Sequence, residues 1–275
     1  MTAPAPGPAT HAAAAHDISR LLFAGVSGTH HAVVEATEPG IIAGTRLLDP
    51  ATTPAPAGTW SLLVEEGARV EPGQPLLRVT GTAAELGVAE DYILGSLGFA
   101  SGIAARASAV RAACPAEMSI ACGGWKKLPA ALKPLLRAGL AVAGVLPRLV
   151  EGDFVYLGKN SVTLLGGVEP AICAGVAVGH GPVAIQVRNV AEALHAIGCG
   201  AGVIMVDTAD LADLRDVVAA LTERNLRDKV RLAFAGGVRV EDLPAVHAAG
   251  ADTVDMGRAI LDAPILDLRL RVLPR

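Results

Sequence analysis

The chain has 275 residues, 52% of them hydrophobic, so it can bury a large core in one big domain or in two modest ones. Its formal net charge is −4, and only 5 of its 23 cationic residues are lysines, without a basic run, which argues against nucleic-acid and membrane partners. No stretch approaches about 18 consecutive apolar residues. Because no Lys or Arg precedes Arg20 either, we expect neither a membrane span nor a secretory signal.

The cysteines are scattered through apolar, Ala/Gly-rich text and form no Cys-x-x-Cys pair. This pattern predicts reduced thiols in the core, rather than a disulfide framework or a zinc site, and therefore a cytoplasmic setting. The histidines show no metal-ligand spacing, and those within predicted helices are expected to be structural. The residues concerned are Cys114, Cys122, Cys173 and Cys199, with His195 and His247 in the helices.

The N-terminal third reads as a small β-rich domain over residues 15–89. Residues 1–14 are rich in Pro and Ala and are predicted to be a disordered tail. Residues 32–48 read as a strand, a Pro-Gly turn and a second strand, and a Pro-rich linker at 51–58 follows. Glycine and proline turns then separate further apolar residues up to Thr80.

A change of pattern at Ala89 predicts a long bridging helix to Val110, because small or apolar residues recur there at a three-to-four spacing. Three glycines within it, Gly95, Gly98 and Gly102, lower its intrinsic stability. We therefore expect another element, such as a second subunit, to pack closely on the glycine face. A merely weak helix is the alternative.

Short apolar runs then recur, with helical text between most of them. The clearest unit is Ile204-Met-Val-Asp207, with predicted helices at 189–197 and 211–221 on either side. Six or seven β/α units predict an incomplete α/β barrel over residues 90–263, and an open doubly wound sheet is the second choice. The runs begin at Met118, Phe154, Val183, Val203, Val230 and Thr253.

Ligands bind at the carboxyl ends of parallel strands, which makes Asp207 the first candidate for function. Gln186 ends the neighbouring predicted strand, so the two side chains could share one metal ion or one ribose. Gly236-Gly237 and Gly257-Arg258 follow the last two predicted strands, where backbone N–H groups of a barrel commonly bind phosphate. The alternative is that these glycines simply make tight turns.

Basic residues follow two other predicted elements. Lys126 and Lys127 come just after a strand, where a cation could meet a pyrophosphate, and a pair of surface lysines is the alternative. Arg148 lies in apolar text, where an arginine without a role is disfavoured.

In this order, the segments resemble the quinolinate phosphoribosyltransferase family of type II phosphoribosyltransferases. The resemblance covers nearly the whole chain after the tail. It implies an incomplete TIM-like α/β barrel, an N-terminal α/β sandwich completed by residues 264–275, and a homodimer or higher homo-oligomer. The implied ligand is phosphoribosyl pyrophosphate or another phosphorylated small molecule, with magnesium as cofactor. The resemblance rests on Gly40-Ile-Ile-Ala-Gly44, Gly67-Ala-Arg-Val-Glu-Pro-Gly73, Ala89-Glu90 with Ser101-Gly-Ile-Ala104, Asn189 through Asp207, Ala235-Gly-Gly-Val238, and Asp255-Met-Gly257 with Ala263-Pro-Ile-Leu-Asp-Leu268.

The resemblance also implies roles for single residues. Asp207 matches the family's ribose-side aspartate and magnesium ligand, Lys126 the lysine of its Arg-Lys motif, and Arg148 the arginine of its His-Arg motif. We take Asp207, Lys126 and Gln186 as candidate catalytic residues. The candidate ligand-binding residues, which include the glycines that match the 5′-phosphate turns, are Trp125, Arg148, Lys159, Gly236, Gly237, Gly257 and Arg258.

Three cations of the family pattern are absent. Trp125 replaces an arginine, Pro147 a histidine, and Gly158 a lysine, with Lys159 one place further on. A buried dicarboxylate needs paired cations, and each lost charge-assisted hydrogen bond costs about 1.5–3 kcal/mol. Quinolinate binding should therefore weaken by several orders of magnitude.

The preferred function is transfer of a phosphoribosyl group to a heteroaromatic acceptor other than quinolinate, on which Trp125 could stack. Gln186 replaces the family's strand-end glutamate, and an amide is a poorer magnesium ligand than a carboxylate. This substitution favours a second hypothesis, in which the protein is a non-catalytic relative like the family's molybdenum-transport-associated branch. The third hypothesis is a lyase or hydrolase of another phosphorylated metabolite. On the bridging helix, Asp91 stands where the family has an arginine that reaches the neighbouring subunit's site.

Overall fold

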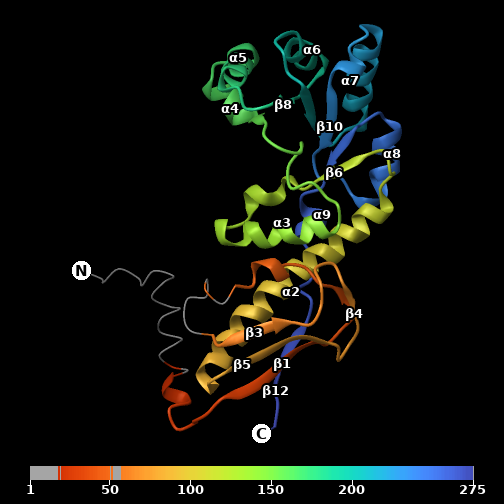
Figure 1. Ribbon diagram of the computed structural model, residues 1–275. Helices are drawn as coiled ribbons and strands as arrows, with labels where there is room; N and C mark the ends of the chain where they lie inside the picture. Colours follow the sequence, from red (N-terminus) through yellow and green to blue (C-terminus); the bar gives the residue numbers. More distant parts are fainter. Residues whose placement is uncertain (1–17, 19, 50, 52–56, 275) are drawn as a thin grey trace, which may run out of the picture. The chain divides into compact units, whose positions relative to one another are not determined.

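The computed structural model describes residues 18, 20–49, 51 and 57–274, and Figure 1 shows its helices and strands in chain order. The chain forms two compact units. The first comprises Met1–Ala105, Ala131–Val142 and Ala263–Arg275, and the second comprises Arg106–Ala130 and Ala143–Asp262. The expected disordered tail and most of the Pro-rich linker lie outside the described residues.

An antiparallel sheet in the order β12-β1-β5-β3 forms one layer of the first unit. Along β1, the alternate side chains of Ala32, Val34 and Ala36 belong to one apolar core, while Val33 and Glu35 on the opposite face are also buried. The strands are β1 (His30–Ala36), β3 (Thr59–Leu62), β5 (Pro75–Gly81) and β12 (Leu268–Val272), with a separate pair of β2 (Gly40–Ile41) and β4 (Arg69–Val70).

The strand predicted after the Pro-Gly turn is wrong beyond its first two residues, because β2 gives way to a 3-10 helix, η1 (Thr45–Leu47). Gly44 adopts a left-handed φ of 89° just before this helix. The Glu66 carboxylate accepts hydrogen bonds from the N–H groups of Gly44 and Thr45, at 2.7 and 2.8 Å. This carboxylate cap turns the chain where its apolar, β-branched text predicts an extended strand.

The predicted bridging helix is present as α2 (Ala83–Ala113) and starts six residues earlier than predicted. A capping box explains the early start, since Glu85 accepts from the Thr82 N–H at 2.7 Å while the Thr82 hydroxyl accepts from the Glu85 N–H at 3.3 Å. By length and composition alone, α2 is apolar enough to cross a membrane. In this fold its apolar residues, such as Ile93 and Leu97, belong to the core of the first unit.

Two of the three helix glycines allow another segment of the same chain to approach α2. The Leu266 N–H donates to the Gly98 carbonyl oxygen at 3.0 Å, and a Cβ added at Gly102 would overlap the carbonyl oxygen of Pro264. Gly95 has open space around it. At Gly98 and Gly102, the close packing predicted for this face is therefore made by the chain's own C-terminal segment.

These glycines provide a matched pair of substitutions. Gly102→Ala should destabilise the protein by about 1–3 kcal/mol, because the added methyl group forces α2 and the C-terminal segment apart. Gly95→Ala should stabilise it by about 0.5–1 kcal/mol through helix propensity alone. Denaturant unfolding measures both values, and equal effects of the two substitutions would contradict this account of the packing.

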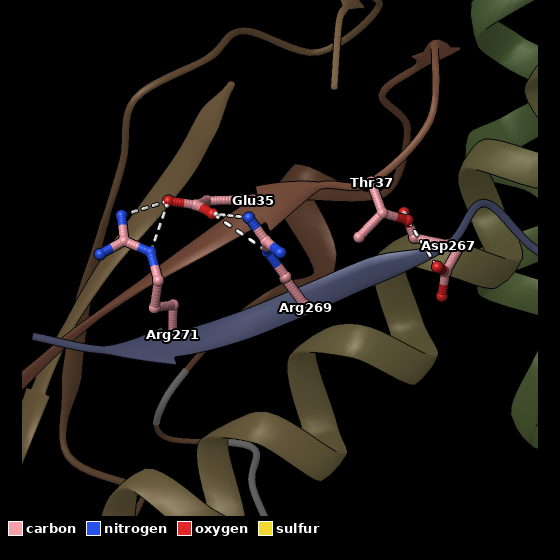
Figure 2. Close-up of polar contacts among 5 residues, drawn as sticks. All are labelled: Glu35, Thr37, Asp267, Arg269 and Arg271. Atoms are coloured by element: carbon pink, nitrogen blue, oxygen red, sulfur yellow. Dashed lines mark hydrogen bonds and ion pairs between the residues drawn. The ribbon is translucent and has the colours of Figure 1, made fainter. Parts of the chain in front are cut away.

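A charged cluster joins the last strand to the first (Figure 2). Glu35 on β1 is only 4% exposed, and its carboxylate accepts hydrogen bonds from two arginines of β12. Arg269 donates from Nε at 3.2 Å and from Nη2 at 3.0 Å, while Arg271 donates to the other oxygen from Nε at 3.0 Å and from Nη2. The hydrogen bonds from Arg271 hold the pKa of Glu35 below its ordinary value.

The cluster should make stability depend on pH. Glu35→Gln should lower the unfolding free energy at neutral pH by about 1.5–3 kcal/mol, because two guanidinium groups lose a charged acceptor. The pKa of Glu35 is lower in the folded state than in the unfolded state. The stability that the Glu35 carboxylate contributes is therefore present above its unfolded-state pKa of about 4.3, and it is lost as pH falls through the folded-state pKa. Urea unfolding from neutral pH down to about pH 3 measures the difference, with the exposed Glu71→Gln as control. A difference that does not shrink on acidification would rule the linkage out.

The second unit is built on a six-stranded parallel sheet in the order β6-β11-β10-β9-β8-β7, the incomplete α/β barrel that the sequence predicts. Each predicted apolar run is a strand within about a residue of its expected bounds. The strands are β6 (Ser119–Ala121), β7 (Val155–Leu157), β8 (Val183–Val187), β9 (Val203–Asp207), β10 (Arg231–Ala235) and β11 (Thr253–Asp255). The helices of this unit are α4 (Lys159–Leu164), α5 (Val168–Val178), α6 (Val190–Gly198), α7 (Leu211–Glu223), α8 (Leu243–Ala248) and α9 (Arg258–Leu261), while α3 (Lys133–Val142) belongs to the first unit.

The cysteines only partly follow the prediction of core thiols. Cys114 and Cys122 are buried, but Cys173 is exposed and Cys199 is partly exposed. Cys173 lies on α5, so its apolar neighbours in the sequence did not indicate which face of the helix it occupies.

Candidate active site

A cavity of about 1180 Å³ opens at the carboxyl ends of the parallel strands in the second unit. All six strands contribute to its lining, either with residues at their carboxyl ends or with the segments that follow, because parallel pairing brings these ends to one edge of the sheet. All ten predicted site residues line it, although their chemical roles stay predictions. They are Trp125, Lys126, Arg148, Lys159, Gln186, Asp207, Gly236, Gly237, Gly257 and Arg258.

The side chains that end β8 and β9 are joined directly. The Gln186 amide nitrogen donates to Asp207 Oδ2 at 2.6 Å, and the Gln186 amide oxygen accepts from the Lys159 N–H at 3.3 Å. In this arrangement Gln186 turns its donor, and not its oxygen, toward the carboxylate. One Asp207 oxygen is therefore already hydrogen-bonded, and the pair carries one negative charge where two carboxylates would carry two.

Asp255, at the end of β11, is a second acid in the cavity. Its Oδ1 accepts from the Gly123 N–H at 2.5 Å, and burial raises the pKa of its carboxyl, with Asp207 adding to the effect. A Cβ at Gly123 would overlap this carboxylate, so a larger residue after Cys122 would displace the Asp255 side chain. The contact fixes the start of η3 (Gly123–Lys127), the 3-10 helix that carries Trp125 and Lys126.

Lys126 contacts a tyrosine that the sequence did not single out. Its ammonium group lies 4.2 Å from the centre of the Tyr156 ring, a cation–π contact. The Tyr156 hydroxyl donates to Met205 Sδ at 3.5 Å. Burial, with Asp207 and Asp255 nearby, raises the pKa of Tyr156 to about 12, so this side chain stays a neutral phenol at physiological pH.

Arg148 lies between two aromatic rings. Its guanidinium carbon is 4.2 Å from the Phe154 ring centre and 5.8 Å from the Trp125 ring centre. These rings explain why an arginine occurs in apolar text, since a guanidinium group stacks on aromatic faces and keeps its N–H donors at its edge. Three aromatic residues, Trp125, Phe154 and Tyr156, thus line the cavity of a chain whose aromatic content is only 3%.

The glycine turn after β10 needs glycine for a steric reason. Gly236 has a φ of 118°, and a Cβ there would lie 2.8 Å from the Cα of Ala209, which itself adopts a positive φ of 64°. Gly237, with a φ of 83°, has open space in front of it. The loops after β9 and β10 therefore pack together and leave the second glycine free to meet a ligand.

The charge of the lining suits an anionic ligand. Six basic and three acidic side chains face the cavity. Arg258 binds Asp262 at 2.8 Å, and Arg239 binds Asp242 at 3.0 Å, so these two are already paired. Among the described residues, Lys126 and Arg148 contact rings and form no salt bridge, although the Lys126 charge also acts on the Asp255 carboxylate. Their N–H donors can therefore meet an anionic ligand.

Sequence reasoning missed Asp255, Phe154 and Tyr156. Asp255 carries the same signal as Asp207, an acid at the carboxyl end of an apolar run, and the same rule would have found it. The aromatic residues belong to the run at β7, where a ring reads as core in the absence of the fold.

The Gln186–Asp207 hydrogen bond leads to a test of cation binding. Gln186→Glu would place a second carboxylate beside Asp207, where the two repel each other until they share a proton or a cation. The affinity for Mg²⁺ or Mn²⁺ should rise at least about tenfold, which calorimetric titration measures. Gln74→Glu, in the first unit, should change nothing. An unchanged affinity in Gln186→Glu would show that Asp207 does not face a cation position.

Comparison with known proteins agrees with this geometry. The family model of the quinolinate phosphoribosyl transferase N-terminal domain matches residues 17–101 of this chain. The family model of the C-terminal domain matches residues 103–271. The nicotinate-nucleotide pyrophosphorylase (carboxylating) of Rattus norvegicus is 29% identical over 250 residues, which cover 90% of this chain and 83% of that protein. The Homo sapiens protein of the same name is 28% identical over 250 residues, which also cover 90% of this chain and 83% of that protein.

A solved structure supports the fold. The nicotinate-nucleotide pyrophosphorylase of Ehrlichia chaffeensis superposes with a TM-score of 0.77 at 15% identity, over 98% of this chain and 100% of that one. The two domain models together span nearly all of the described residues and include every strand end that lines the cavity. The chain therefore belongs to the quinolinate phosphoribosyl transferase family and has that family's fold, an incomplete α/β barrel with an N-terminal sandwich domain.

Proposed function

We propose that this protein transfers a phosphoribosyl group from phosphoribosyl pyrophosphate to the ring nitrogen of a heteroaromatic acceptor other than quinolinate. The observation that carries the proposal is the composition of the cavity wall. Glycine turns and cations in the wall suit phosphates. Trp125 and Gly158, which also line the cavity, and Pro147, next to Arg148 in the chain, occupy the positions at which the family resemblance implies cations for the two carboxylates. Membership of a phosphoribosyltransferase family supports the reaction class.

The phosphates of the donor would bind to the glycine turns and to the basic residues. Gly236, Gly237 and Gly257 border the cavity, so we assign their N–H groups to the 5′-phosphate. Lys126 and Lys159 would neutralise the pyrophosphate, which departs as the bond from ribose C1 breaks and the bond to the acceptor nitrogen forms.

Asp207 would stabilise the ribose as it becomes oxocarbenium-like, because its exposed carboxylate lies at the cavity. Magnesium, as a hard cation, takes oxygen ligands and keeps several waters. The Asp207 oxygen that does not accept from Gln186 is such a ligand, so the residues fit a magnesium ion held also by donor phosphates. A bound magnesium ion would neutralise negative charge on the pyrophosphate.

The acceptor side of the proposal rests on the aromatic residues. Trp125 and Phe154 offer ring faces, and Arg148 between them can pair with a single anionic substituent. A ring with one acidic group or none is therefore the favoured acceptor, whereas a second carboxylate would be buried without a partner.

A second candidate, a non-catalytic relative that binds a phosphorylated ligand, is favoured by one observation. The amide of Gln186 occupies one oxygen of Asp207, which lowers the charge available for magnesium. A homodimer also remains a proposal. Asp91 and Gly95 are exposed on α2, so a second copy that packs on α2 would contact this part of the helix rather than the covered Gly98 and Gly102.

Variants at Asp207, on the ribose side of the site, and at Gly257, on the phosphate side, should separate transfer from binding. Asp207→Ala should reduce transfer about 10²–10³-fold, yet keep the affinity for ribose 5-phosphate. Gly257→Val should weaken ribose 5-phosphate binding, because a branched side chain would fill the phosphate's place. Asp216→Ala, exposed on α7, should leave both unchanged.

Chromatographic product analysis and calorimetry supply these measurements. With quinolinate as acceptor at millimolar concentration, wild type should form no nicotinate mononucleotide. Robust formation would contradict the proposed acceptor class. If ribose 5-phosphate binds but no acceptor in a panel of heteroaromatic rings reacts, the non-catalytic candidate is the better one.

A further inference from the structure

Two helices of the second unit, α5 and α6, lie next to each other (Figure 1), and each carries two potential metal ligands. Glu169 and Cys173 are four residues apart on α5. His195 and Cys199 are four residues apart at the end of α6. Residues at this spacing lie above one another on the same helix face, so each helix offers a pair of ligands.

The distances within the cluster are close to those of a metal site. The ligand atoms of Glu169, His195 and Cys199 all lie within 4.8 Å of one another, and His195 Nε2 is 3.7 Å from Glu169 Oε2. Bonds of about 2.0–2.3 Å to a tetrahedral zinc ion separate the ligand atoms by roughly 3.3–3.8 Å. Side-chain rotations that draw the atoms together by about 1 Å would therefore complete the coordination.

Cys173 would supply the fourth ligand. It lies one helical turn after Glu169 on α5, which packs against α6, although its sulfur is not among the three ligand atoms that lie within 4.8 Å of one another. Cys173 and Glu169 are exposed, so both side chains are able to rotate toward a cation. A cation would also neutralise the carboxylate and the two thiolates that form when the thiols release their protons.

We propose that Glu169, Cys173, His195 and Cys199 form a Zn²⁺ site. Two thiolates, an imidazole and a carboxylate match the ligand preference of zinc over magnesium or calcium, which take oxygen ligands. None of the four residues lines the active-site cavity. The site is thus separate from the proposed transfer chemistry and does not depend on it.

A plain surface ion pair between His195 and Glu169 is the competing explanation. The protein offers a reference for it, since His180 lies 3.5 Å from Asp153 and both side chains are exposed. That pair belongs to no candidate metal cluster in the described part of the chain. The thiols beside His195 and Glu169 are what distinguish the proposed site.

The position gives zinc a structural role. α5 precedes β8 and α6 follows it, so a metal that joins the two helices would restrain the strand that carries Gln186 toward the cavity. Four protein ligands leave no open position for substrate, as in structural zinc sites. Zinc should therefore raise the unfolding temperature of the protein.

The test is a competition titration of the full chain, reduced with a phosphine and stripped of metal, with Zn²⁺ against a chromophoric chelator. Wild type should bind one equivalent, and Co²⁺ in its place should give a thiolate-to-cobalt absorption band. Cys199→Ser and His195→Ala should each lose more than the roughly 10–100-fold in affinity that outer-shell changes cost. His180→Ala should bind like wild type.

Thermal unfolding separates loss of the site from loss of the fold. Without metal, all variants should unfold at the wild-type temperature, and zinc should raise that temperature only in wild type and in His180→Ala. Equal affinities in wild type and Cys199→Ser, or a cobalt complex without the thiolate band, would overturn the proposal. Glu169→Gln and Cys173→Ser should each weaken binding, and no effect of either would exclude that residue from the ligand set.

Discussion

The parallel pairing of the barrel strands is the constraint on which the site depends. In this register Asp207 pairs with Ala235 of β10, and Asp255 pairs with Ala121 of β6. Parallel strands have their carboxyl ends at the same edge, so acids, glycine turns and cations that are far apart in the chain meet around one cavity. A one-residue slip of β9 would turn Asp207 toward the helices and dismantle the site.

The cavity wall combines charged side chains with aromatic rings. Lys126 and Arg148 lie against the rings of Tyr156 and Phe154 and form no salt bridge with a described residue, so the rings position both cations. Gln186 satisfies one oxygen of Asp207 and keeps the acidic side of the cavity at low charge. Under the proposed function, this arrangement would suit a ligand with a dense anionic end and a flat ring, and a ring with two carboxylates would bury one of them without a partner.

The sequence was sufficient for features that depend on local pattern. Apolar runs that end in Asp207 or precede Gly236 predicted strands and a site edge, because buried parallel strands have few other sequence signatures. Features that depend on long-range contact were not predictable. The Gly123–Asp255 hydrogen bond joins residues 132 positions apart, and no property of either neighbourhood indicates the other.

The same reasoning explains two errors. The strand expected after the Pro-Gly turn is replaced by η1 because Glu66, more than twenty residues away, caps the turn at Gly44. The cysteines looked like core residues, yet helix packing brings the Cys199 sulfur close to ligand atoms of His195 and Glu169. A search for ligand spacing within one segment cannot detect such a cluster, because two helices share it.

The central claim is that the part of the cavity lined by Gly236, Gly237 and Gly257 binds the phosphates of a donor. The part around Trp125 and Gly158 no longer holds a dicarboxylate. The most direct measurement is a pair of calorimetric titrations of the wild-type protein, one with phosphoribosyl pyrophosphate in the presence of Mg²⁺ and one with quinolinate. The account predicts saturable binding of phosphoribosyl pyrophosphate and no binding of quinolinate at millimolar concentration. Binding of quinolinate as tight as that of phosphoribosyl pyrophosphate, or no binding of phosphoribosyl pyrophosphate at all, would contradict it.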